Sequence, residues 1–277
     1  TNTGQLTLGN GVTLTSHGYQ DVVTGNNGSV FKGDGSVKQA MFNSGATISP
    51  GLNTMQIQYF LLNSGSTYEI TANDSGSASR IEATNLTLNR DAKFHINALS
   101  GNWSTTQTYE ILTANNIATG TNNVNTVSSN NITSNFAYLT PVISTAVTGS
   151  SGVFTLTLTP NNVPNPGGGG GGGNGNTGLL ATHAQTSNQI GVANAVESLG
   201  SSHPVYNHVL TLPAGAPAEA FNSLSGEAHA SFLAGLPNIT SHAYRLPLAN
   251  LRHSLNAGLN PAAVTAQVGG TQGSSGL

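Results

Sequence analysis

Ser225, Glu227 and His229 are the residues whose types and spacing come closest to a catalytic set. A hydroxyl nucleophile, a carboxylate and an imidazole base could together hydrolyse a bond. On a helix, however, residues four apart share a face, so Ser225 and His229 would lie together while Glu227 would point away. The chain also has no Gly-x-Ser-x-Gly segment, the pattern that exposes a serine nucleophile. We therefore interpret these residues as the polar face of a helical segment and predict no catalytic residue.

Metal-ligand patterns are equally weak. The chain has eight histidines and no cysteine, and no two histidines have the His-x-x-x-His spacing of zinc sites. His203 and His208 lie close together, but no carboxylate is near them. Asp34 resembles a fragment of a calcium-binding loop, yet the repeated acidic positions of such loops are missing, so a turn is favoured. We predict neither a metal site nor a cofactor.

Three further features could bind a ligand. The glycine run 167–173 is not a phosphate-binding loop, since no Lys-Ser or Lys-Thr follows it. Asp74 and Asp91 are isolated, whereas enzymes that cleave polysaccharides need clustered carboxylates. Trp103 could stack on a sugar, but a single tryptophan more often fills the end of a core. These features favour a protein that is not an enzyme.

Composition narrows the class of protein. Of 277 residues only 6% are charged, with 7 Lys+Arg against 10 Asp+Glu and a net charge of -3, which argues against binding nucleic acid. Asn, Ser, Thr and Gly supply the polarity, as in repetitive β proteins or in disordered chains. The regularly spaced 36% of hydrophobic residues favour a folded chain. Thr1 opens strand-like sequence rather than a signal peptide, and no apolar run approaches about 20 residues. We expect the two ends to be processing boundaries.

The first 160 residues are predicted to form short β-strands. Residues 153–159 alternate strictly between apolar and polar, which indicates a half-buried strand. Shorter runs of the same kind occur at 6–8, 12–14, 68–70, 86–88, 94–96 and 109–112, separated by Gly, Asn, Asp or Ser. Such spacing suits a solenoid or a sandwich. Because we find no strict repeat length, periodicity alone does not choose between the two.

Helical periodicity begins after a flexible tether, which Pro164, Pro166 and the glycine run form. Thr186 and Gln189 match a capping box, which predicts a helix closed by Gly200 with an apolar stripe of Val192, Ala195, Val196 and Leu199. A second helix is predicted from Pro217, with a stripe of Phe221, Leu224, Ala228 and Phe232. A weaker third candidate carries Leu248, Leu251 and Leu255. These helices are too short to bury a core alone, and no partner for them is evident in the sequence.

The order of these segments resembles the C-terminal passenger region of bacterial autotransporters (type V secretion), over roughly residues 45–258. Residues 46–51, which contain Pro50 and Gly51, look like the Ser-Pro-Gly turn that opens this pertactin-like, autochaperone region. Residues 64–70, 86–88, 108–114, 136–141 and 153–159 resemble its later strands. Around Val192, Val196 and Leu199 the chain resembles the helix that links passenger to translocator. Residues 220–231 resemble the segment before the first barrel strand, through Leu224, Ser225, Gly226, Glu227 and His229.

The chain departs from this family in two places. A translocator barrel needs a long series of alternating membrane strands, and the chain stops at Leu277 without them, so we expect the barrel to be absent from this chain. Ser79, Arg80 and Ile81 also stand where many relatives carry an Asp-containing turn. The assignment of strands around them is correspondingly open.

The resemblance implies a mainly β fold: the end of a right-handed parallel β-helix with a capping β region, then a Gly-rich linker and short amphipathic α-helices. Residues 1–45 would be β-helix rungs, 46–160 the cap, 161–178 the linker and 179–277 the helical linker before the barrel. The implied core of the cap, behind the opening turn Pro50-Gly51, is Phe94, Tyr109, Ile111, Phe136, Tyr138, Phe154, Leu156 and Leu158.

The implied function is a non-enzymatic passenger stem that supports folding, secretion and surface display. The protein would lie on the bacterial surface or be secreted, from a precursor anchored in the outer membrane. Its partners would be the translocator barrel of the same precursor, the barrel-assembly machinery and host surface ligands. The lack of cysteine fits a chain that crosses a pore unfolded. Two alternatives remain: an adhesin or serum-resistance module that binds host matrix or glycans, and a β-helix enzyme that acts on polysaccharide.

Overall fold

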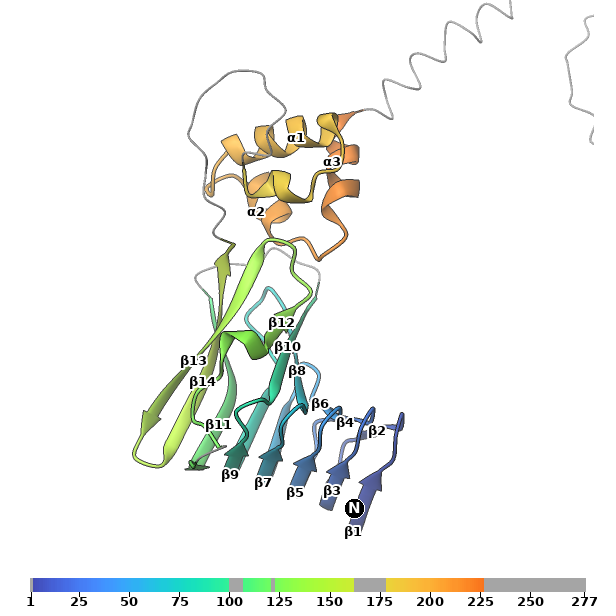
Figure 1. Ribbon diagram of the computed structural model, residues 1–277, viewed down its shortest axis with the longest axis vertical. Helices are drawn as coiled ribbons and strands as arrows, with labels where there is room; N and C mark the ends of the chain where they lie inside the picture. Colours follow the sequence, from blue (N-terminus) through green and yellow to red (C-terminus); the bar gives the residue numbers. More distant parts are fainter. Residues whose placement is uncertain (1, 100–106, 121–122, 162–177, 227–277) are drawn as a thin grey trace, which may run out of the picture. The chain divides into compact units, whose positions relative to one another are not determined.

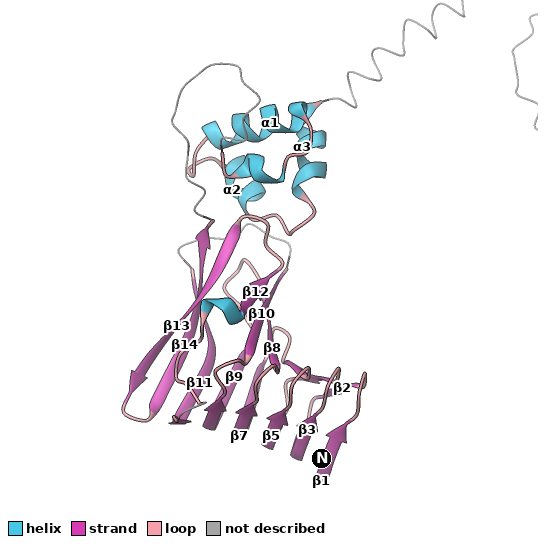
Figure 2. Ribbon diagram, viewed as in Figure 1, coloured by secondary structure: helices cyan, strands magenta, loops and turns pink. Residues whose placement is uncertain are grey.

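The computed structural model describes residues 2–99, 107–120, 123–161 and 178–226 (Figure 1). Two compact units divide the chain, Thr1–Phe221 and Asn222–Leu277. Among the described residues, strands lie before residue 162 and helices after 177, apart from one short 3-10 helix among the strands (Figure 2). The prediction of a mainly β fold is confirmed.

The strands up to β12 alternate between two sheets along the chain, and β13 and β14 both belong to the first sheet. The eight-stranded sheet has the order β1 (Asn2–Leu8), β3 (Tyr19–Gly25), β5 (Ser36–Phe42), β7 (Thr54–Leu62), β9 (Arg80–Leu88), β11 (Thr108–Ala118), β14 (Ser151–Pro160) and β13 (Leu139–Thr148). The six-stranded sheet has the order β12 (Ile132–Ser134), β10 (Lys93–Ala98), β8 (Thr67–Ala72), β6 (Thr47–Ser49), β4 (Val30–Gly33) and β2 (Thr13–Ser16). Pairing is parallel throughout except for β11 with β14 and β14 with β13. Each odd strand up to β9 and the even strand after it therefore form one repeating unit, which we call a coil.

An asparagine ladder marks the turn from the first sheet to the second. The side-chain amide of Asn43 donates to Oδ1 of Asn26 (2.9 Å), 17 residues earlier, and that of Asn63 donates to Oδ1 of Asn43 (2.8 Å), 20 residues earlier. Gly28 and Gly45, two residues after the first two asparagines, have φ of +74° and +79°, which glycine adopts without strain. These Asn-x-Gly turns are a repeat that the sequence analysis did not recognise, because the interval between them changes from coil to coil.

The core lies between the sheets and is built from aromatic and branched side chains. The rings of Phe31 and Phe60 each lie 6.4 Å from that of Phe42, between centroids, and all three are almost completely buried. Full burial of such a side chain contributes about 1.5–3 kcal/mol to the free energy of folding. Alternate residues of the strands face inward, as the pattern of β8 illustrates. The stack of inward-facing rings therefore holds successive coils together.

The helical part contains η2 (Leu180–His183), α1 (Ser187–Ser198), α2 (Pro204–Leu210) and α3 (Pro217–Ser225), while η1 (Ser129–Asn131) precedes β12. The capping box of Thr186 and Gln189 is present, and α3 begins at Pro217 as predicted. Helix α2 was not predicted. The third predicted helix lies outside the described residues. No helix in the described ranges is both long and apolar enough to span a membrane.

The predicted stripe of α1 is partly wrong. Val196 is buried and Val192 partly so, but Ala195 and Leu199 are exposed, Leu199 by 42%. Ala193 and the polar Gln189 are buried instead. Gln189 tolerates burial because its amide Nε2 donates to the backbone oxygen of Ala218 (3.1 Å) and its Oε1 accepts backbone hydrogen bonds before α1. This network rotates the buried face of the helix relative to the purely apolar pattern.

Candidate functional site

The residues predicted for the core of the cap lie at the end of the sheets farthest along the chain from β1. Phe94 is on β10, Tyr109 and Ile111 are on β11, and Phe136 and Tyr138 precede β13. All eight are at most 8% exposed: Phe94, Tyr109, Ile111, Phe136, Tyr138, Phe154, Leu156 and Leu158. Pro50 and Gly51 stand apart from them, in the turn between β6 and β7, where Gly51 has φ of +71°.

Strand β11 is where the sheet changes direction. It pairs parallel with β9 on one side and antiparallel with β14 on the other, so that Leu112 lies between Ile81 and Phe154. The antiparallel register shifts between Glu110 and Leu112, which leaves Ile111 as an unpaired extra residue, the pattern of a β-bulge. The hairpin of β14 and β13 follows, and no described strand pairs beyond it. This hairpin ends the parallel series.

A buried tyrosine donates a hydrogen bond to the backbone oxygen of the bulge residue Ile111. The hydroxyl of Tyr68, on β8 of the opposite sheet, donates to the backbone oxygen of Ile111 at 2.8 Å and lies 3.2 Å from that of Ser79. Burial raises the pKa of Tyr68 well above its usual value. An unpaired buried carbonyl would be costly. The hydrogen bond from Tyr68 therefore stabilises the bulge of β11 and connects it to the six-stranded sheet.

The chain before β13 binds the helical part through its backbone. The backbone N–H of Ala137 donates to the oxygen of Leu212 (3.0 Å), and that of Ala214 donates to the oxygen of Asn135 (2.6 Å). Between these bonds Phe136 and Pro213 form an antiparallel bridge. The helices therefore have a partner within the chain, which the sequence analysis did not find.

Side chains reinforce this junction around Tyr138. Its hydroxyl donates to the backbone oxygen of Leu180 (2.8 Å), and its ring meets His183 edge to face at 4.9 Å between centroids. Nε2 of His183 lies 3.2 Å from the backbone oxygen of Ala137, so that nitrogen must carry the proton to donate. Burial and the negative charge of Glu197 raise the pKa of Tyr138. Tyr138 thus connects the β region to η2.

Glu197 of α1 holds the start of η2. Its carboxylate accepts hydrogen bonds from the backbone N–H groups of Leu179 (3.0 Å) and Leu180 (2.8 Å). The buried apolar cluster of the sheets also includes residues of the helical part, namely Leu180, Ala181, Val196, Val209 and Leu210. We call this arrangement of β11, the β13–β14 hairpin, η2, α1 and α2 the closed end.

Glu197→Ala is expected to lower the free energy of unfolding by about 1.5–3 kcal/mol, because two backbone N–H groups lose a charged acceptor. Urea denaturation followed by circular dichroism measures the loss. Equal denaturation midpoints for Glu197→Ala and the unsubstituted chain would contradict the role assigned to Glu197.

Alkaline pH is expected to destabilise the closed end. The folded state holds the pKa of Tyr138 above the value of about 10 in the unfolded chain. Its contribution to stability is therefore complete below pH 10 and is lost as the pH rises from there toward the folded pKa. Thermal denaturation from pH 8 to 11 measures this loss, which Tyr138→Phe should reduce. An identical pH dependence in Tyr138→Phe would sink the explanation.

The remaining predicted residues lie in or beyond α3. Leu224 is 49% exposed, the hydroxyl of Ser225 donates to the backbone oxygen of Asn222 (2.7 Å), and Gly226 ends the helix with φ of +70°. Glu227 and His229 are outside the described residues. The predicted apolar stripe is wrong at Leu224, and α3 ends at Ser225, so it does not extend to the Ala228 and Phe232 of that stripe or to His229.

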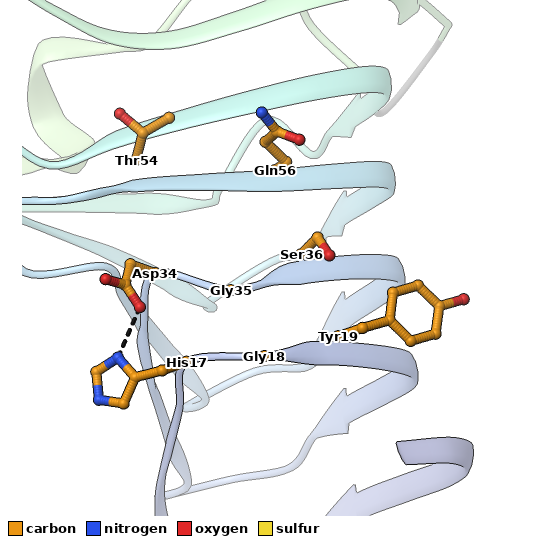
Figure 3. Close-up of a pocket in the computed structure, with 8 residues that line it drawn as sticks. All are labelled: His17, Gly18, Tyr19, Asp34, Gly35, Ser36, Thr54 and Gln56. Carbon is orange, nitrogen blue, oxygen red and sulfur yellow. Dashed lines mark hydrogen bonds and ion pairs between the residues drawn. The ribbon is translucent and has the colours of Figure 1, made fainter. Parts of the chain in front are cut away.

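A polar pocket of about 320 Å³ lies away from the closed end, along the turns that lead into β3, β5 and β7 (Figure 3). Nδ1 of His17 lies 2.6 Å from Oδ1 of Asp34, and these side chains are 69% and 39% exposed. The other ring nitrogen of His17 points away from Ser36, so the three residues do not form a hydrolytic triad (Figure 3). The described part of the chain contains no group of three or more His, Cys, Asp or Glu that could hold a metal. Water competes strongly for so exposed an ion pair, which makes the pocket a weaker candidate site than the closed end.

No family model and no curated protein matches this sequence. The closed end is consequently interpreted from its geometry. Sequence reasoning placed Tyr68 on a strand and Glu197 on a helix but missed the roles of Tyr68, His183 and Glu197, because their partners lie far along the chain.

Proposed function

We propose that the chain is the C-terminal passenger stem of an autotransporter, which supports folding, secretion and display of the region before it. In this proposal the two parallel sheets are the last coils of a right-handed β-helix. The protein would stand on the bacterial surface or be secreted, and its partner would be the translocator of the same precursor.

One observation carries the proposal: the parallel series ends in an antiparallel hairpin at one end and in unpaired parallel strands at the other. The hairpin of β14 and β13 continues the eight-stranded sheet beyond β11, whereas the outer edges of β1 and β2 have no described partner strand. Leu6 and Leu14 at that open end are only partly buried. In a stack of coils each coil is stabilised by its neighbours, so a closed end is the natural starting point for folding and an open end accepts further coils.

Two alternatives, an adhesin and an enzyme that acts on polysaccharide, have separate tests. A glycan-binding adhesin is the second candidate, and the polar pocket at His17 and Asp34 is the observation that favours it. Binding of the purified chain to immobilised glycans, lost in His17→Ala, would support the adhesin. Release of reducing sugar from a polysaccharide would revive the enzyme.

Deletion of residues 136–161 from the full-length precursor tests the stem directly. Without the hairpin, the region before the stem should still reach the cell surface but be digested by external protease. Leu156→Asp should have the same effect with the chain length unchanged. Protease resistance equal to that of the intact precursor in both variants would refute the proposed role in folding.

A further inference from the structure

Strand β13 is an open sheet edge of unusual length. It is the outermost strand of the eight-stranded sheet and pairs with β14 over ten consecutive residue pairs without a bulge (Figure 1). The other edge of β13, away from β14, has no described partner strand. Its backbone N–H and C=O groups on that side are therefore available to another strand.

Over residues 142–148, β13 lacks the features that normally prevent edge pairing. Natural edges are kept apart by lysines, prolines, bulges or short strands. Residues 142–148 contain no charged residue and no proline, since Pro141 stands before them. Val142 and Val147 are 39% and 41% exposed on this strand. A segment of β-branched residues without charge favours pairing with another strand.

Thr145 lies in the middle of this edge, and its hydroxyl is buried without a hydrogen-bond partner among the described residues. Antiparallel pairing of the strand with a second copy, centred on Thr145, would place the two Thr145 side chains opposite each other. Rotation about χ1 exchanges the hydroxyl and methyl positions, so each hydroxyl could then bond the other. The same register sets Ile143 opposite Val147 of the second copy and places no charge opposite another.

We propose that two copies of this chain pair through β13, antiparallel and centred on Thr145, to join their eight-stranded sheets into one continuous sheet. A second copy is the occupant that the strand fits, because residues equally spaced about Thr145 are matched in size, as Ser144 with Ala146 and Ile143 with Val147. The interface is isologous, so it closes as a dimer and does not continue as a filament.

Sedimentation of the purified full chain tests the pairing, with two charge variants. Val147→Lys puts a charge on the edge at an exposed position, where it should not disturb folding of the single copy. Thr159→Lys puts the same charge at an exposed position of β14, which β11 and β13 flank. The unsubstituted chain and Thr159→Lys should form a dimer that dissociates on dilution, and Val147→Lys should sediment as a monomer. A monomer at every concentration for the unsubstituted chain, or equal dimerisation of all three, would overturn the proposal.

Cross-linking tests the register, since the chain has no cysteine of its own. Facing residues of antiparallel strands have Cα atoms about 4.5–5.5 Å apart, within the range that a disulfide spans. Under mild oxidation, Thr145→Cys should form a disulfide-linked dimer, and a mixture of Ile143→Cys with Val147→Cys should give the mixed dimer. Thr159→Cys should stay monomeric. Cross-linking of Thr145→Cys no faster than that of Thr159→Cys would contradict the register.

Discussion

Leu156→Asp is expected to lower the free energy of unfolding by about 3–5 kcal/mol, because it buries an unpaired carboxylate in the closed end. Leu156 is completely buried and stands between Tyr109 of β11 and Ile143 of β13. A charge there disrupts the three strands that end the parallel series. Chemical denaturation measures the loss, and limited proteolysis shows whether the coils before β11 unfold with the cap.

Thr157→Asp is the matched control for this change. Thr157 is the next residue of the same strand, half-exposed on the opposite face, so its carboxylate stays in water. We expect a loss below about 1 kcal/mol for this variant. Unchanged stability of Leu156→Asp, or equal losses for both variants, would contradict the packing described for the closed end.

Gly33→Ala is expected to lower the free energy of unfolding by about 2–4 kcal/mol, because the last residue of β4 has no room for a side chain. Gly33 has φ of +124°, and a Cβ added there would collide with the backbone oxygen of Ser16 in the preceding coil. The coils must move apart, or the backbone at Gly33 must change conformation, to accept a methyl group. Thermal denaturation and proteolysis of the first coils report the effect.

Gly18→Ala provides the comparison, since a Cβ there meets nothing within 4 Å and the backbone has no positive φ. It should be neutral or slightly stabilising, through reduced freedom of the unfolded chain. If both alanine variants had the same stability, close stacking of the turns would not limit the fold. A large loss in Gly33→Ala alone is the expected outcome.

Local patterns predicted those parts of the fold that depend on neighbouring residues. Strict alternation located β14, and the capping box of Thr186 and Gln189 located the start of α1. Strands such as β3 and β5 were not predicted, because their apolar and polar residues alternate poorly. Each is stabilised by hydrogen bonds to a parallel strand about 17 residues away, and these are not visible in its own sequence. The turns that repeat Asn-x-Gly carried the missing signal, but their changing interval hid it.

The closed end could be predicted only in part, for a physical reason. The alternation of apolar and polar residues predicts that an apolar residue such as Leu156 is buried, whereas the sequence does not show which group a polar residue will bind. Nothing near Glu197 indicates that its carboxylate holds the N–H groups of Leu179 and Leu180. The same holds for Tyr68, because its acceptor, the backbone oxygen of Ile111, belongs to a bulge that the sequence does not reveal.

Hydrogen exchange of the native chain, read by mass spectrometry, is the most direct test of the account. If the closed end is the stable element on which the coils order, the amides of β9, β11 and β14 should exchange last and those of β1 and β2 first, with a gradient between them. The Leu156→Asp variant should lose protection along the whole series. Protection of β1 to β5 equal to or greater than that of β11 and β14 would contradict the proposal that folding starts from the closed end.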